Sequence, residues 1–420
     1  MKLISSTAIV LASAVIAAPA AAQYGAAAPP PTRSGQAASA QPAAQAQPQI
    51  KPSAKAVKAI VDLQTAVNNK DFANVPAKVA AAEAVATTKE DRYLIARLQL
   101  NAAVAQNDNA AMARALDAIA QSGYLDSAKM AGLYLGLGAN FYNSKQYPQA
   151  VLALQKATAM DPNNAEASRL YGVALFQAGQ KAEAFSAFQK AIHASVAAGK
   201  KPDEDLYKLA VQSAFDTKSP EAAAIAREWV AAYPSPESWR NAIAIYRNLG
   251  GQDTEGTLDL LRLMQATGSL HNAGDYALFA SADAEQNNWN EAQAVLDAGE
   301  AAHVVNPAAP DMRDIIAAVK AKPKASAADL AAATKAAVNG MALLHIGDRY
   351  YAMGDYPKAV QLYRMALGKP GVDTAVANLH IGMALARQGD KAGAITALNS
   401  VTGPRADIAK YWLIYVNQKG

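Results

Sequence analysis

The sequence predicts an all-α protein built as a solenoid of stacked helical hairpins, and two observations carry this prediction. From about residue 54 onward the chain is rich in Ala, Leu, Lys, Glu and Gln and lacks the alternating β-branched residues of strands. Two stretches of equal length, LGANFYNSKQYPQAVLALQKAT and YGVALFQAGQKAEAFSAFQKAI, begin 34 residues apart, at Leu137 and Tyr171 (171 − 137). One hairpin cannot cover its own apolar faces, so we expect neighbouring repeats to stack.

The first 22 residues have the layout of a secretory signal peptide. Lys2 precedes an apolar stretch from Leu3 to Ala18, and the small residues Ala20–Ala22 suit a cleavage site. The apolar stretch is short for a membrane anchor. We therefore expect cleavage after the last of these alanines and a periplasmic or secreted chain. Residues 23–53 are rich in Ala, Gln and Pro, which predicts a disordered linker.

Composition excludes several classes of function. The chain has no cysteine, so disulfides, thiol nucleophiles and thiolate metal sites are excluded. Its formal net charge is +4, and the basic residues are interspersed with acidic ones, which does not fit nucleic-acid binding. His345 and His380 lie one repeat apart, and equivalent atoms on stacked helices are about 8–10 Å apart, too far to share a zinc ion. We expect no cofactor, no metal and, without a recognisable catalytic constellation, no enzymatic activity.

The clearest repeats follow one another over residues 131–198. In the first, one helix carries a large residue, a large–small pair and an aromatic residue on one face. The second helix carries a small–large–small series, and a proline then ends the unit. These residues are Tyr134, Leu137, Gly138, Phe141, Tyr147, Ala150, Leu154, Ala157 and Pro162. The glycine removes side-chain bulk in the middle of the face, so that another helix can approach closely.

This pattern resembles the tetratricopeptide repeat family. The second unit matches less fully, since Ser168 replaces the first large residue and the closing proline is missing. Two further matches lie within residues 340–402, at Leu343, Ile346, Gly347, Tyr350, Tyr356, Ala359, Tyr363 and Ala366, and then at Ile381, Gly382, Leu385, Ala394 and Leu398. The resemblance implies a right-handed superhelix, formed in one run of repeats or in two.

Elsewhere the pattern is weaker. Residues 54–130 are interpreted as divergent helical hairpins, and residues 203–307 as degraded repeats in which Trp229 replaces a small residue and must pack differently. The pattern loses its phase over residues 308–339, which predicts an irregular connector. Residues 403–420 carry three large aromatic residues and are expected to form a closing helix over the last exposed apolar face.

The resemblance also implies a binding surface, because the first helices of the family's repeats line a concave face that meets peptide ligands. One such position carries Tyr142, Phe176 and Tyr351, whose rings would give an extended peptide flat apolar contact. The alternative is that these rings pack on the adjacent helix as core. The candidate groove residues are Tyr142, Arg169, Phe176, Tyr207, His345, Asp348, Tyr351, His380 and Arg387.

The sequence therefore predicts a non-catalytic scaffold of the bacterial cell envelope that binds a protein or peptide partner through its concave face. The Lys/Asn set with which some family members clamp a terminal carboxylate is missing at these positions, which argues against a chaperone-tail ligand. An alternative is an accessory factor or lyase acting on envelope or exported polysaccharide, although no paired carboxylates stand out. Self-assembly through an uncapped end is a third hypothesis, against which the closing helix argues. We expect no membrane span after signal cleavage, and the oligomeric state stays open.

Overall fold

The structure of the protein is a computed structural model that describes residues 50–250 and 253–419. These residues form twenty-one α-helices, one short 3-10 helix and no strand, which confirms the all-α prediction. The expected signal peptide (1–22) and all but the last four residues of the expected linker (23–53) lie outside the described residues. In the described part of the chain, no helix combines the length and apolar character needed to cross a membrane.

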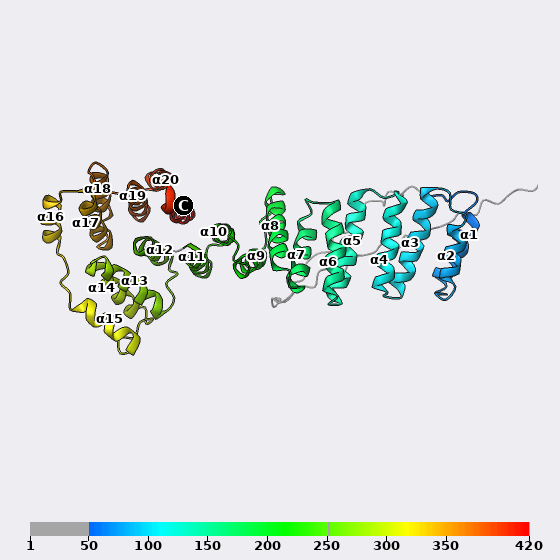
Figure 1. The fold of residues 1–420 in the computed structure, drawn as a ribbon, viewed down its shortest axis with the longest axis horizontal. Coiled ribbons are helices and arrows are strands. Elements are labelled where there is room, and N and C mark those ends of the chain that lie inside the picture. Colours follow the sequence, from blue (N-terminus) through cyan, green and yellow to red (C-terminus); the bar gives the residue numbers. More distant parts are fainter. Residues whose placement is uncertain (1–49, 251–252, 420) are drawn as a thin grey trace, which may run out of the picture. The chain divides into compact units, whose positions relative to one another are not determined.

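The chain divides into two compact units, residues 1–180 (unit 1) and 181–420 (unit 2) (Figure 1). The boundary falls inside the repeat expected at residues 165–198, so its first helix belongs to unit 1 and its second to unit 2. The helices of unit 1 are α1 (Val57–Asn68), α2 (Val75–Glu83), α3 (Lys89–Ala105), α4 (Asn109–Ser122), α5 (Ser127–Asn143), α6 (Tyr147–Met160) and α7 (Ala165–Gln177).

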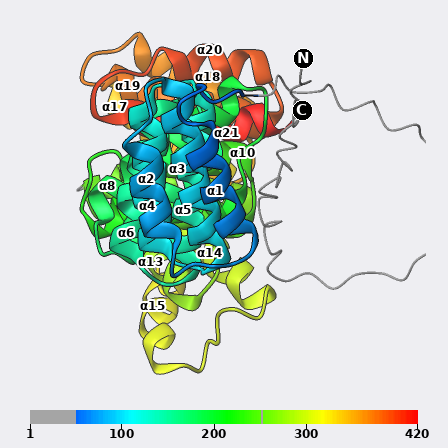
Figure 2. The ribbon, with the colours of Figure 1, turned by 90° about the vertical axis from the view of Figure 1, so that its right-hand side faces the viewer.

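Unit 1 is a stack of helical hairpins. Helix α1 packs on α2, α3 on α4 and α5 on α6. Figure 1 shows these helices next to one another, and Figure 2 views the stack from its end, with α1 and α2 nearest the viewer. Asp108, Asp126 and Asn164 start helices α4, α5 and α7 by accepting a hydrogen bond from a backbone N–H of the first turn. The divergent segment 54–130 thus contains the hairpins α1–α2 and α3–α4 and the start of α5.

In three of the clear hairpins, a glycine in the first helix receives a large side chain from the second helix. A Cβ atom at Gly138 would overlap the side chain of Leu154, which is fully buried. The same arrangement recurs in unit 2, where Gly347 faces Tyr363 and Gly382 faces Leu398. The close approach expected from the repeat pattern is therefore present, and it buries the large residue.

Unit 2 holds the remaining helices. They are α8 (Lys181–Ala197), α9 (Glu204–Asp216), α10 (Ala222–Ala232), α11 (Pro236–Gly250), α12 (Thr254–Thr267), α13 (Ala273–Glu285), α14 (Trp289–Ala301), α15 (Pro310–Lys320), α16 (Ala327–Ala336), α17 (Gly340–Ala352), α18 (Tyr356–Leu367), α19 (Thr374–Gln388), α20 (Lys391–Asn399), the 3-10 helix η1 (Gly403–Arg405) and α21 (Ala406–Gln418). The segment expected as an irregular connector, 308–339, carries the short helices α15 and α16.

Helix α21 closes unit 2 on itself, since it packs on α19 and α20 and also on α10 and α12 (Figure 1, red). Tyr411 and Trp412 are fully buried. The Tyr411 hydroxyl donates to the carbonyl of Ala242 (3.1 Å), and the Trp412 indole Nε1–H donates to the carbonyl of Asp259 (3.3 Å). Helix α21, which was expected to cover the end of the solenoid, thus also joins α10 and α12 to α19 and α20 within unit 2.

Candidate functional site

The groove position that carries Tyr142, Phe176 and Tyr351, called the ladder position below, has the same place relative to the turn in each hairpin. Tyr142, Phe176 and Tyr351 each lie three residues before a turn residue with positive φ. Phe215 at the end of α9 has the same place, because Lys218 follows it by three residues with φ 51°. The four turn residues are Lys145, Gly179, Lys218 and Gly354. The structure therefore adds Phe215 to the ladder position.

A groove runs between α9 and α11, the first helices of two successive hairpins of unit 2. We call it the α9–α11 groove, and its open space is about 820 Å³. The residues of each helix that line it are three or four positions apart, so each set lies on one helical face. The groove is lined by Lys208, Val211, Gln212, Phe215, Trp229, Glu237, Asn241, Ala244, Ile245 and Asn248.

The α9–α11 groove combines apolar contact area with polar groups. Phe215 is 40% exposed, an unusual value for a large apolar side chain, whereas Trp229 is 3% exposed. The Trp229 Nε1–H donates to Oε1 of Glu204 (3.1 Å), which explains how the sequence tolerates an indole where the repeat expects a small residue. Lys208 Nζ lies 3.6 Å from the same carboxylate oxygen, so its charge is balanced inside the protein.

The three candidate residues of unit 1 are all partly buried. Tyr142 packs against the core of unit 1, and its ring centroid lies 5.6 Å from that of Tyr147. Arg169 forms two hydrogen bonds with the Glu166 carboxylate, at 2.7 and 2.6 Å. Phe176 is half-buried near the end of α7. Their role in binding a peptide stays a prediction.

Tyr207, the candidate on α9, lies away from the α9–α11 groove. It is 4% exposed and borders a separate groove with Val196 and Glu228, residues of α8 and α10. Its ring meets that of Tyr233, with centroids 6.2 Å apart. Burial, with the nearby carboxylate of Glu228, raises the pKa of Tyr207 above its usual value, so the phenol keeps its proton.

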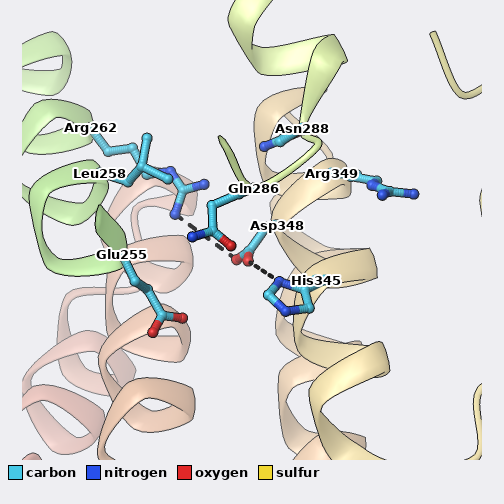
Figure 3. A pocket seen from close by; sticks show the side chains of 8 residues that line it. All are labelled: Glu255, Leu258, Arg262, Gln286, Asn288, His345, Asp348 and Arg349. Atoms are coloured by element: carbon cyan, nitrogen blue, oxygen red, sulfur yellow. Dashed lines mark ion pairs between the residues drawn. The ribbon is translucent and has the colours of Figure 1, made fainter. Parts of the chain in front are cut away.

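Five charged side chains form a buried charge cluster in unit 2, made of Asp259, Arg262, Glu291, Asp348 and His380 (Figure 3 shows Arg262 and Asp348). Arg262 makes a bidentate pair with Glu291 through Nε (3.0 Å) and Nη2 (2.7 Å). His380 lies between two carboxylates, 3.0 Å from Asp259 through Nε2 and 2.9 Å from Asp348 through Nδ1. The cluster joins helices α12, α14, α17 and α19.

The carboxylates of this cluster set the charge of its histidine. Burial alone favours a neutral imidazole, but Asp259 and Asp348 raise the pKa of His380 to about 10. Burial likewise favours protonation of Asp348, yet His380 and Arg262 hold its pKa well below the usual range. Burial and the nearby Glu291 carboxylate raise the pKa of Asp283 well above its usual value. His380 is therefore positively charged at neutral pH, like Arg262 beside it.

The buried charge cluster opens toward solvent through a narrow pocket lined by Glu255, Leu258, Arg262, Gln286, Asn288, His345, Asp348 and Arg349 (Figure 3). His345 lies at this pocket with its side chain 41% exposed, and Nδ1 is 3.9 Å from Oδ2 of Asp348. No group of three or more His, Cys, Asp and Glu residues in the described part of the chain is placed to hold a metal ion. The five charged side chains of the cluster form ion pairs with one another, which tie together the helices that carry them.

Of the remaining candidates in unit 2, His380 and Tyr351 are 1% and 6% exposed. The Tyr351 ring lies under Arg262, whose Cζ is 5.4 Å from the ring centroid. Arg387 is half-buried, with its Cζ 5.5 Å from the ring centroid of Tyr356. The structure therefore brings His345, Asp348, Tyr351 and His380 together, but around the buried charge cluster rather than along one exposed surface.

Three members of the cluster were not anticipated from the sequence, namely Asp259, Arg262 and Glu291. A signal for two of them is present in TLDLLRLMQ (257–265), where Asp259 and Arg262 stand three residues apart inside an apolar run. A helix that is apolar on all sides is buried, so an acid–base pair at that spacing within it predicts a buried ion pair.

Comparison with known families gives the geometry a name. Residues 135–202 and 344–407 match the family model described as tetratricopeptide repeat. These two segments of the chain are tetratricopeptide repeats. The matched segments begin within α5 and α17 and include Gly138 and Gly347, which receive the large side chains of α6 and α18 described above. No curated protein matches the sequence significantly.

Solved structures that resemble this protein are distant in sequence. YrrB, described as a protein with an unusual peptide-binding site, is 18% identical, with 44% of this chain and 86% of YrrB covered and a TM-score of 0.30. Naa15/Naa10 bound to HypK-THB is 11% identical, with 84% and 63% covered and a TM-score of 0.38. PilF of Pseudomonas aeruginosa is 13% identical, with 63% and 97% covered and a TM-score of 0.24.

Proposed function

We propose that this protein is a non-catalytic scaffold of the bacterial cell envelope that binds an extended peptide segment of another envelope protein. The binding site is the α9–α11 groove. The observation that carries the proposal is this groove between two successive first helices, with Phe215 exposed at the ladder position. The envelope location is supported by the signal-like residues 1–22.

The composition of the groove suits a peptide. Phe215 and Ile245 offer apolar surface, and aromatic anchors of this kind dominate the energy of most interfaces. Asn241 and Asn248 add carboxamides, each of which can both donate to and accept from a peptide backbone, and Gln212 adds a third whose Nε2 also donates to Asp216 (2.6 Å). The apolar side chains of the groove thereby supply affinity, and hydrogen bonds to the backbone of the peptide fix its register.

Site-specific photocrosslinking in living cells tests this function. A photoreactive residue placed at Asn241 is expected to crosslink to one partner, and Phe215→Ala is expected to weaken that crosslink. The matched control places the photoreactive residue at Leu152, which is 62% exposed on α6 and outside the groove.

Helicity and melting of the Phe215→Ala variant should equal those of the wild type, since an exposed side chain contributes little to stability. A partner that crosslinks equally from both positions, or that Phe215→Ala leaves unaffected, would contradict the proposed site.

A further inference from the structure

The two ends of the α9–α11 groove differ in charge. Glu237 lies in the first turn of α11, its side chain is exposed, and it makes no ion pair with any described residue. Lys208 on the facing helix already pairs with Glu204 at 3.6 Å. The uncompensated charge at this end of the groove is therefore the negative charge of Glu237.

The other end of the groove combines apolar side chains with the exposed carboxamide of Asn248. Phe215 lies in the last turn of α9, and Ile245 lies on the same face of α11 as Glu237, eight residues further along (245 − 237). Between the ends, the groove exposes the carboxamides of Gln212 and Asn241. A ligand along α11 thus meets first a carboxylate, then hydrogen-bonding groups, then an apolar wall beside a further carboxamide.

The helix geometry sets the spacing that a ligand must have. Eight residues of α-helix rise about 12 Å, and an extended chain covers about 3.3 Å per residue. A ligand residue over Glu237 and one over Ile245 are therefore separated by three or four positions.

On the basis of the proposed function, we infer that the ligand of the α9–α11 groove is an extended segment carrying a Lys or Arg three or four residues from a large apolar residue. The basic residue pairs with Glu237, and the apolar residue fills the space beside Phe215 and Ile245. Electrostatic complementarity of this kind selects partners more than it adds affinity.

Fluorescence anisotropy with short labelled peptides, capped at both termini, tests the inference on the full chain. One peptide places Lys four positions from Phe, a second replaces this Lys by Glu, and a third places Lys next to Phe. The first peptide is expected to bind about 1.5- to fivefold more tightly than the other two, the range of an exposed ion pair. The preference should shrink as salt rises.

Charge reversal identifies the residue responsible. Glu237→Lys is expected to reverse the preference between the Lys and Glu peptides, and Glu237→Gln to abolish it, while Phe215→Ala weakens all three. Glu183→Lys is the matched control, because Glu183 is also an exposed first-turn glutamate but lies on α8. Thermal melting verifies that each variant folds.

The possible failures are distinguishable. Equal affinity for the Lys and Glu peptides, or a preference unchanged by Glu237→Lys, overturns the charge assignment while peptide binding in the groove stands. An absence of binding for every peptide, or binding that Phe215→Ala does not weaken, overturns the proposed site together with the inference.

Discussion

Replacing Arg262 by Met should destabilise unit 2 strongly while leaving unit 1 unchanged. The Arg262 side chain is 3% exposed and lies 3.4 Å from Asp259 in addition to its bidentate pair with Glu291. Methionine has a similar length but no charge, so His380 would be the only cation left among three carboxylates. Removing one partner of a buried ion pair costs about 3–5 kcal/mol, because the other charge stays buried without compensation.

For a unit of this size, each kcal/mol shifts the melting temperature by about 2–4 °C, so a decrease of about 6–20 °C is expected. Hydrogen exchange measured by mass spectrometry during urea unfolding separates the two units, and protection should fall in α12 and α14 but not in α5. Arg313→Met is the control, since the Arg313 side chain is 67% exposed beside Asp314.

A double variant, Arg262→Met with Glu291→Met, isolates the charge from the loss of packing. It should be more stable than Arg262→Met alone, because it removes the carboxylate that the single change leaves unpaired. A loss below about 1 kcal/mol in the single variant, the value typical of an exposed pair, would refute the assignment of Arg262 as the buried counter-ion.

Three further predictions concern packing, pH and closure. Gly138→Ala should destabilise unit 1 by about 1–3 kcal/mol in urea unfolding, because the added Cβ overlaps the leucine of α6, whereas Gly136→Ala, with open space around it, should be neutral or stabilising. The pKa of His380 is raised from 6.5 to about 10, so its charge stabilises unit 2 fully below pH 6.5 and this stabilisation is lost as the pH rises toward 10. The difference in unfolding free energy between wild type and His380→Gln, measured from pH 6 to 11, should therefore shrink as the pH rises. Tyr411→Phe removes one buried hydrogen bond and should lower the stability of unit 2 by about 0.5–1.5 kcal/mol, measured by thermal unfolding.

The hairpins were predictable because the residues that pack their two helices together lie close in the sequence. The glycine at 138 and the leucine at 154 lie sixteen residues apart (154 − 138), within one repeat, and their sizes are complementary. Such a size pattern determines which faces of two sequential helices meet, whatever the rest of the chain does. The same reasoning holds for Gly347 with Tyr363.

The position of Phe215 was harder to find because two signals are missing: its turn has no glycine, and Trp229 breaks the repeat pattern in the next helix. Tyr142 also precedes a turn without glycine, but its hairpin matches the repeat pattern almost completely. In the clear hairpins that contain Phe176 and Tyr351, a glycine adopts the left-handed conformation after the helix, and this glycine indicates in the sequence where the helix ends. After α9 this residue is Lys218, which adopts positive φ against its own preference. The sequence therefore gives no glycine signal for the end of α9.

The buried charge cluster depends on contacts that no local pattern encodes. His380 and Asp259 are 121 residues apart, and Arg262 and Glu291 are 29 apart. On separate helices each charge is compatible with a solvated face, and burial results only when α12, α14, α17 and α19 come together. The sequence placed His380 at a repeat-equivalent position but could not supply its partners.

Helix α21 has a consequence for the biogenesis of the protein. Its contacts with Asp259, Ala242 and Val230 join residues 153, 169 and 188 positions apart. At a synthesis rate of about 5–20 residues per second, these partners wait roughly 10–40 s on the nascent chain before α21 exists. During this interval the apolar faces that α21 will cover are exposed to other chains, so unit 2 is most prone to aggregation, and most in need of a chaperone, just before its last helix is made.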